Sequence, residues 1–297
     1  VGVAMATSGP GATNMVTGLA TAKLDSIPIV CITGQVPRPA IGTDAFQEVD
    51  IYGTVFPVTK YSYLVMDIND LASIIKEAFA VARSGRPGPV LIDIPKDVQN
   101  EKIEFEYPRK PVKLPGNNII KKPEKDKLLK AATLINNSKK PVILAGHGIL
   151  LSGASQEIIK LAEIASIPVT WTLLGSGGVP ASHPLNMGMM GMHGEYAVNN
   201  AIQEADLLIA CGMRFDDRVT GDVSTYSLNS KKIHIDIDPS EMNKIIPVDV
   251  GIVCDLKNTV TELLPLIEKK SNKIWFKIIQ KWQSESKSRD IINTKTE

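Results

Sequence analysis

The stretch VGVAMATSGPGATN, residues 1–14, joins an apolar run to a predicted helix through the turn Ser8-Gly9-Pro10-Gly11. Two further apolar runs follow, IPIVCIT (27–33) and PVLIDIP (89–95), with helical patterns between them. Apolar runs without polar alternation are typical of strands that are covered on both faces. The first hundred residues therefore predict an α/β domain with a doubly wound parallel sheet.

A second alternation of helices and strands runs from about Glu124 to about residue 270. Its five predicted strands lie at 141–145, 168–171, 206–211, 232–238 and 251–254. Five strands with helices between them predict a second doubly wound parallel sheet. The Lys- and Pro-rich stretch 101–123 predicts a linker, and the polar stretch 271–297 predicts an exit linker.

Composition excludes several classes of protein. The chain has 297 residues with 33 Lys+Arg against 32 Asp+Glu, so its net charge of +1 gives no basic face for nucleic acid. No apolar run approaches the roughly 18–20 residues that span a bilayer, which predicts a soluble protein without a membrane partner. The three cysteines are scattered through apolar stretches, which predicts buried free thiols: Cys31, Cys211 and Cys254.

Glycines and charges follow several predicted strands. Gly146-His147-Gly148 follows one strand, the charged stretch 212–218 follows another, and 234–238 and Asp255 close the last two. Ligands of open parallel sheets bind outside the carboxyl ends of the strands. Carboxylates there accept hydrogen bonds from ribose or ribityl hydroxyls, and arginines neutralise phosphate. A single strand-end Asp is usually a helix cap, but four such strand ends together favour a nucleotide-type cofactor.

Two loops are open to more than one interpretation. The Met- and Gly-rich stretch 187–194 fits either gap-filling core or a loop wrapped on a flat ligand. The long loop that contains Asp44 and Glu48 is of a length that usually carries function, but loop carboxylates are mostly solvated. No His or Cys set has metal-ligand spacing, so no metal site is predicted in this chain.

Six strings in the chain together resemble the large catalytic subunit family of acetolactate (acetohydroxyacid) synthase, a thiamine-diphosphate enzyme family. They are ATSGPGATN, ITGQVPRPAIGTDAFQE, SGRPGPVLIDIPKD, GMMGMHGE, CGMRFDDRVTG and HIDIDPSE. The resemblance implies that residues 1–100 are the C-terminal part of a pyrimidine-binding domain and that 124–270 are a complete central flavin-binding domain. The chain opens on Val1 inside a strand of a kind that is normally central. The family's catalytic glutamate would precede residue 1, and its GDG…N motif, which binds Mg²⁺, would follow residue 297 in a diphosphate-binding domain. We therefore expect a fragment that is inactive alone and contains no catalytic residue.

The resemblance also implies three groups of site residues. The thiamine side would be Asn14, Ser26 and Gln47. The substrate channel would be Pro37, Arg38, Phe46, Lys60, Lys96, Asp217 and Arg218. FAD would contact Arg86, Gly148, Thr172, Leu173, Met190, Gly191, Met192, His193, Gly212, Met213, Arg214, Phe215, Asp216, Asp236, Ile237, Asp255 and Leu256.

The implied reaction joins two 2-oxo acids in the biosynthesis of valine, leucine and isoleucine. Pyruvate loses CO₂ and condenses with pyruvate or 2-oxobutanoate to give 2-acetolactate or 2-aceto-2-hydroxybutanoate. The implied cofactors are FAD, thiamine diphosphate and Mg²⁺, the last two requiring the further domain. The implied assembly is a homodimer with a small regulatory subunit, in the cytoplasm or in a plastid stroma. The alternatives are another thiamine enzyme, of the pyruvate oxidase or glyoxylate carboligase type, and a non-catalytic nucleotide-binding protein.

Overall fold

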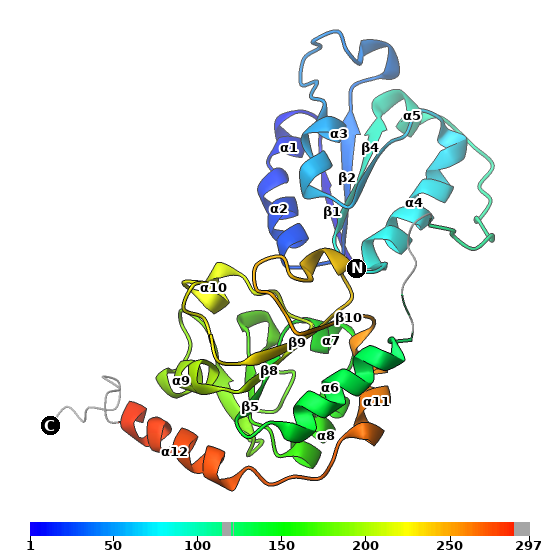
Figure 1. The fold of residues 1–297 in the computed structure, drawn as a ribbon. Helices are drawn as coiled ribbons and strands as arrows, with labels where there is room; N and C mark the ends of the chain where they lie inside the picture. Colours follow the sequence, from blue (N-terminus) through cyan, green and yellow to red (C-terminus); the bar gives the residue numbers. More distant parts are fainter. Residues whose placement is uncertain (115–119, 121, 288–297) are drawn as a thin grey trace, which may run out of the picture. The chain divides into compact units, whose positions relative to one another are not determined.

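The computed structural model describes residues 1–114, 120 and 122–287 (Figure 1). The chain divides into two compact units, residues 1–118 and 119–297. Both units are α/β folds whose strands are all parallel, as predicted.

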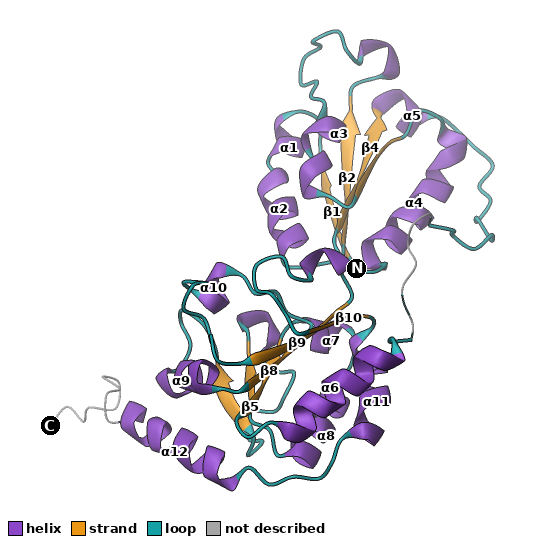
Figure 2. Cartoon of the chain, in the orientation of Figure 1, coloured by secondary structure: helices purple, strands orange, loops and turns teal. Residues whose placement is uncertain are grey.

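The first unit contains a four-stranded sheet in the order β1-β2-β4-β3. The strands are β1 (Gly2–Ala6), β2 (Ile29–Gln35), β3 (Tyr61–Leu64) and β4 (Pro89–Pro95). The helices are α1 (Pro10–Thr13), α2 (Val16–Leu24), α3 (Ile51–Thr54), α4 (Ile68–Arg83) and α5 (Lys96–Asn100), and 3₁₀ turns lie at Arg38–Ala40 and Phe56–Val58. Figure 2 shows α2 and α4 on opposite sides of this sheet.

Alternate residues of β4 explain why both faces of the first sheet are covered. Val90 and Ile92 pack toward α4, whereas Leu91 packs toward α2 and α3. Among the described residues, β1 is an edge strand of this sheet and pairs with β2 alone. Its side chains Val3 and Met5 are exposed as a result.

The second unit contains a six-stranded sheet in the order β10-β9-β8-β5-β6-β7. The strands are β5 (Pro141–Ala145), β6 (Val169–Trp171), β7 (Asn186–Met189), β8 (Leu207–Cys211), β9 (Lys231–Asp236) and β10 (Val250–Val253). The helices are α6 (Lys125–Asn137), α7 (Gly148–Leu151), α8 (Ser155–Ala165), α9 (Tyr196–Glu204), α10 (Asp217–Thr220), α11 (Leu256–Leu263) and α12 (Lys273–Lys287). Short 3₁₀ turns lie at Leu173–Gly175, Pro239–Glu241 and Leu264–Leu266.

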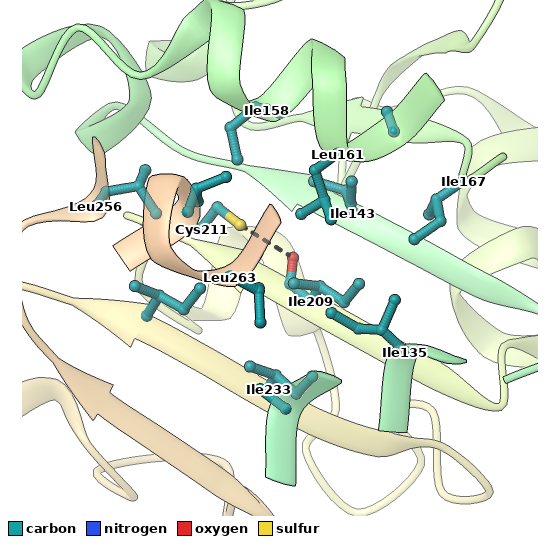
Figure 3. Packing of buried hydrophobic residues seen from close by; sticks show 14 of the residues in the cluster. Ile135, Ile143, Ile158, Leu161, Ile167, Ile209, Cys211, Ile233, Leu256 and Leu263 are labelled. Atoms are coloured by element: carbon teal, nitrogen blue, oxygen red, sulfur yellow. Dashed lines mark hydrogen bonds between the residues drawn. The ribbon is translucent and has the colours of Figure 1, made fainter. Parts of the chain in front are cut away.

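One row of isoleucines forms the centre of the larger core in this unit. Ile143, Ile209 and Ile233 are partners in the register of β5, β8 and β9, and all three are fully buried. Helices α6, α8 and α11 cover them (Figure 3). Cys211 lies in the same cluster, where its thiol contacts the Ile209 carbonyl oxygen at 3.7 Å. All three cysteines of the chain are buried and unpaired, as predicted.

Two predictions about the second unit are wrong. The sheet has a sixth strand, β7, where the sequence predicted only a Met- and Gly-rich loop. The predicted exit linker 271–297 contains helix α12, because Trp275 and Ile279 on one helical face enter the core beside α9. The last ten residues of that predicted linker lie outside the described residues.

The stretch between the units keeps an irregular backbone over its described part. Residues 101–114 contain no helix or strand, and Lys76 on α4 donates a hydrogen bond to the Lys110 carbonyl oxygen at 3.0 Å. Residues 115–119 and 121 of the predicted linker lie outside the described residues. Over the part of the chain that the structure describes, no helix is long and apolar enough to cross a membrane.

Candidate cofactor-binding site

The second sheet has a point where its strand order reverses. The chain starts with β5 in the middle, adds β6 and β7 on one side, and then returns to place β8, β9 and β10 on the other side. The crevice between β5 and β8 at their carboxyl ends is where dinucleotides bind in doubly wound sheets. The glycine-rich turn after β5 and the charged stretch after β8 both lie at this point.

Backbone hydrogen bonds join these strand ends. The Gly146 amide donates to the Cys211 carbonyl at 2.9 Å, and the Gly148 amide donates to the Gly212 carbonyl at 2.9 Å. The Gly212 amide donates in turn to the Ile235 carbonyl of β9 at 2.8 Å. The ends of β5, β8 and β9 are therefore held in register with one another.

The glycines at this point cannot be replaced without moving backbone. A Cβ on Gly146 would lie 2.6 Å from the Met213 Cα and closer still to the Gly212 oxygen. A Cβ on Gly148 would lie 2.6 Å from the Gly212 Cα, and Gly212 itself has a φ of +58°. Because neighbouring backbone occupies the space of a Cβ at Gly146 and Gly148, these glycines allow the ends of β5 and β8 to approach each other closely. We call the turn 146–148 and the segment 212–218 the cradle, which lies where doubly wound sheets bind dinucleotides.

Arg214 and Arg218 have different surroundings. The Arg214 side chain is 30% exposed and lies 3.5 Å from the Asp216 carboxylate, whereas the Arg218 side chain is 70% exposed. Asp216 also begins α10, because its carboxylate accepts hydrogen bonds from the amides of Arg218 (3.1 Å) and Val219 (3.2 Å). Asp217 projects into solvent.

The Met- and Gly-rich loop packs against α10. The Met192 amide donates to the Arg218 carbonyl at 2.8 Å, and the Arg218 Nη1 lies 3.2 Å from the Met192 sulfur. Gly191 exchanges two hydrogen bonds with the side chain of Asn199, a residue that its place in the sequence did not mark as functional. Met190 is buried, whereas Met192 and His193 are exposed beside the cradle's charged segment.

The remaining flavin candidates of the second unit follow strand ends. The Thr172 amide donates to the Ala145 carbonyl at 3.0 Å, and Leu173 after it is exposed. Asp236 is followed by Ile237, and its carboxylate accepts from the Asp238 amide. Asp255 caps α11 through the Asn258 amide. The side chains of Met213, Phe215 and Leu256 are core residues, so only their backbone is available to a ligand.

His234 is a buried residue of this site that sequence reasoning did not assign. Its Nε2 lies 2.8 Å from the Met213 carbonyl oxygen, and its ring packs edge-on against Phe215 with centroids 5.2 Å apart. A carbonyl oxygen can only accept, so His234 Nε2 is the donor of this hydrogen bond, and burial lowers the pKa of the ring. His234 thereby holds the segment after β8 in place.

In the first unit, several channel candidates gather at one edge of the sheet. Pro37 and Arg38 follow β2, Lys96 follows β4, and Phe46 and Gln47 lie in the loop after β2. Gly9, after β1, adopts a φ of +59°, and a Cβ there would lie 3.0 Å from the Gln47 Cα. Asn14 is exposed between α1 and α2, in the segment that follows this same edge.

Arg38 is held by two acidic residues that sequence reasoning did not assign to the site. Its Nε lies 2.6 Å from the Asp97 carboxylate, and its Nη2 contacts Glu101. The Arg38 hydrogen bond holds the pKa of Asp97 below its usual value. This arrangement ties the turn after β2 to α5.

Ser26, Lys60 and Arg86 do not join these residues. Each precedes a strand, so all three belong to the amino edge of the sheet. Arg86 Nε donates to the Ser26 hydroxyl at 2.9 Å, and Lys60 Nζ donates to the Val81 carbonyl at 2.6 Å near the end of α4. Burial, and then Lys23 nearby, lower the pKa of Lys60 to about 8.

Comparisons with known proteins agree with this architecture. Residues 128–263 match the family described as "Thiamine pyrophosphate enzyme, central domain", and residues 1–54 match "Thiamine pyrophosphate enzyme, N-terminal TPP binding domain". The acetolactate synthase large subunit of Corynebacterium glutamicum is 51% identical over 264 residues, which are 89% of this chain and 42% of that protein.

The chain is homologous to acetolactate synthase large subunits. The isozyme 1 large subunit of Escherichia coli is 47% identical over 95% of this chain and 50% of its own length. A probable acetolactate synthase large subunit of Methanocaldococcus jannaschii is 48% identical over 94% of this chain and 48% of its own length. The chain thus spans about half the length of these acetolactate synthase relatives. Among the described residues, no group of three or more His, Cys, Asp or Glu side chains could hold a metal ion.

Proposed function

We propose that this chain takes part in thiamine-diphosphate-dependent acetolactate synthesis. The observation that carries this proposal is sequence identity: about half of the residues are identical to those of acetolactate synthase large subunits over about nine tenths of the chain. The substrates would be pyruvate with a second pyruvate or 2-oxobutanoate. Thiamine diphosphate, when bound, supplies the electron sink that accepts the electron pair released when CO₂ leaves.

The second unit would bind FAD at the reversal point of its sheet. Gly146, Gly148 and Gly212 let the ends of β5 and β8 approach closely where a diphosphate would bind, and half-buried Arg214 supplies a positive charge beside it. Asp236 and Asp255 close neighbouring strands and offer carboxylate acceptors for ribityl or ribose hydroxyls. Thr172, Leu173 and the 190–193 loop would complete the flavin site.

The first unit would contribute groups at the carboxyl edge of its sheet. Asn14 and Gln47 offer amide groups to the thiamine side, and exposed Pro37 and Phe46 offer apolar surface that excludes water from a substrate channel. Lys96 is an exposed cation that suits the carboxylate of a 2-oxo acid. In the second unit, the channel candidates Asp217 and Arg218 are exposed on α10. The opposite edge of this sheet contains three further candidates that the resemblance implies: Ser26 for the thiamine side, Lys60 for the substrate channel and Arg86 for FAD.

The activity is tested in the natural polypeptide that contains residues 1–297. It is incubated with pyruvate, thiamine diphosphate, Mg²⁺ and FAD, and acetoin is assayed after acid decarboxylation. We expect acetolactate that requires thiamine diphosphate. Formation of acetyl phosphate or hydrogen peroxide from pyruvate, or of tartronate semialdehyde from glyoxylate, in place of acetolactate would identify a different thiamine enzyme. If no product forms, the remaining interpretation is a non-catalytic nucleotide-binding protein.

Arg214→Ala is expected to weaken FAD binding by about 10- to 150-fold, since a charge-assisted hydrogen bond contributes about 1.5–3 kcal/mol. Arg218→Ala is the matched control, because this more exposed arginine lies on α10 and should mainly affect turnover. Flavin absorbance retained after gel filtration measures the difference. Equal loss of flavin from both variants would contradict the assignment of Arg214 to the phosphate.

A further inference from the structure

Asp93 is a buried carboxyl group in the middle of an apolar strand. It lies on β4 and is 1% exposed. One of its oxygens accepts the Thr33 hydroxyl at 2.7 Å, and the other accepts the Gln35 amide nitrogen at 2.9 Å. Both of these partners lie on β2 and are uncharged. A buried carboxyl group whose hydrogen-bond partners are neutral is costly, so a specific role is expected for it.

Gln35 connects Asp93 to the loop that follows β2. Its Oε1 accepts the Val36 amide at 2.8 Å, and its Nε2 donates to the Val49 carbonyl at 2.8 Å as well as to Asp93. The two contacts to Val36 and Asp93 leave one possible orientation of the amide, with Nε2 toward the carboxyl group. In that orientation a single side chain holds both ends of the loop 36–49.

The loop between these ends has no regular structure to hold its shape apart from one short turn. Asp44 and Gln47 adopt positive φ values of 56° and 61°, which side-chain-bearing residues rarely adopt. Glu48 closes the loop internally by accepting the Ala45 amide at 3.0 Å and the Gly42 amide. Apart from these internal bonds and the tie of Arg38 to Asp97, the loop conformation depends on how its two ends are fixed.

We propose that Asp93 is a positioning residue that fixes Gln35, and through it the loop 36–49, so that Pro37, Phe46 and Gln47 are held at the carboxyl edge of the first sheet. This inference rests on the proposed function, in which these loop residues meet thiamine and substrate. Asp93 and Gln35 are themselves buried, at 1% and 7% exposed, so their proposed role is to position the loop.

The surroundings of Asp93 agree with this role. Burial raises its pKa to about 6, with Asp50 acting in the same direction and the hydrogen bonds from Thr33 and Gln35 acting in the opposite one. A protonated carboxyl group can still accept from Gln35 with one oxygen while its O–H donates to the Thr33 hydroxyl. The contact to Gln35 is therefore compatible with both protonation states.

Cleavage by chymotrypsin after Phe46 reports on the loop without any need for activity, because Phe46 is 88% exposed within it. We expect Asp93→Leu to be cleaved there at least about 10-fold faster than the wild type. Loss of a hydrogen bond to a charged group costs at least about 1.5 kcal/mol, which raises the population of the open loop by that factor. Asp93→Asn should restore slow cleavage, because its oxygen can accept from Gln35 while its amide donates to Thr33. Thr33→Val removes the other hydrogen bond to Asp93 and should leave cleavage close to that of the wild type.

Gln35→Leu gives the same test if Asp93→Leu does not fold, because it removes the side chain that bonds both loop ends. In the natural polypeptide, Asp93→Leu or Gln35→Leu should also raise the KM for pyruvate by about 10-fold, while Thr33→Val should not. Cleavage no faster in these variants than in Thr33→Val overturns the proposal, and so does faster cleavage with an unchanged KM. If the wild type forms no acetolactate, the proposed function fails, whereas the cleavage rates still decide whether Asp93 positions the loop.

Discussion

Trp275→Ala is expected to lower the free energy of unfolding of the second unit by about 3–5 kcal/mol, the usual cost of truncating a buried tryptophan. Trp275 is 2% exposed on α12, and its indole N–H donates to the Pro141 carbonyl oxygen at 3.1 Å. Its ring also packs edge-on against Trp282 with centroids 5.8 Å apart. The substitution therefore leaves both a cavity and an unpaired carbonyl at the start of β5.

Urea unfolding followed by tryptophan fluorescence measures this effect selectively. All three tryptophans of the chain lie in the second unit, and Trp171 and Trp282 remain as probes in the variant. Ile274→Ala is the matched control on the same helix, because Ile274 is 78% exposed and should change stability by less than about 0.5 kcal/mol. Similar midpoints for Trp275→Ala and the wild type would show that α12 does not belong to this core.

Gly146→Ala is expected to destabilise the second unit by about 2–4 kcal/mol and to abolish FAD binding at micromolar concentration. The added methyl group would meet backbone atoms of Gly212 and Met213, which cannot rotate away as a side chain could. Relief of that contact requires the ends of β5 and β8 to separate at the proposed diphosphate position. The measurements are urea unfolding and flavin absorbance after gel filtration.

A second glycine in the same unit provides the control for Gly146→Ala. Gly153 has a φ of +64°, and a Cβ at this position would have no heavy atom within 4 Å. Asparagine tolerates such a φ, so Gly153→Asn should retain FAD and lose little stability. Retention of FAD by Gly146→Ala, or equal loss of FAD from both variants, would contradict the proposal that FAD binds at the ends of β5 and β8.

Strands that are buried along their whole length were predictable from the sequence to the residue. β4 and β5 occupy the predicted ranges 89–95 and 141–145, because each is a run of apolar residues, interrupted in β4 by Asp93 alone, that is bounded by Lys and Gly. β7 was not predictable in this way, since its asparagine and glycine have low strand propensity and its pairing with β6 is irregular in register. Only the neighbouring strand explains its extended conformation.

Helix α12 shows how a charged composition can hide an amphipathic pattern. Trp275, Ile278, Ile279 and Trp282 follow the i, i+3, i+4, i+7 spacing of a buried helical face, although lysines stand between them. The many charged residues of the stretch 271–297 predict a linker, whereas the spacing of its apolar residues predicts an amphipathic helix. The second prediction agrees with the structure.

The candidate site was predictable where it depends on strand ends and not where it depends on strand register. The glycines after β5 and the charges after β8 follow from chain order alone. The contact of Asp93 with Thr33 and Gln35 depends on the pairing of β2 with β4, in which Thr33 lies opposite Asp93. A lone carboxyl group inside the run PVLIDIP was the available signal. Ser26 and Lys60 precede strands and so lie at the opposite edge of the sheet from Pro37 and Phe46, and their assignment to the site stays a prediction.

Titration with FAD, followed by the change in flavin fluorescence, tests the proposed site of the second unit most directly. The natural polypeptide that contains residues 1–297 is titrated with FAD and, in parallel, with NAD. We expect saturable FAD binding in the micromolar range, no competition by equal concentrations of NAD, and marked weakening in Arg214→Ala. Absence of FAD binding at micromolar concentration, or equally tight binding of NAD, would contradict the assignment of the second unit as a flavin-binding domain.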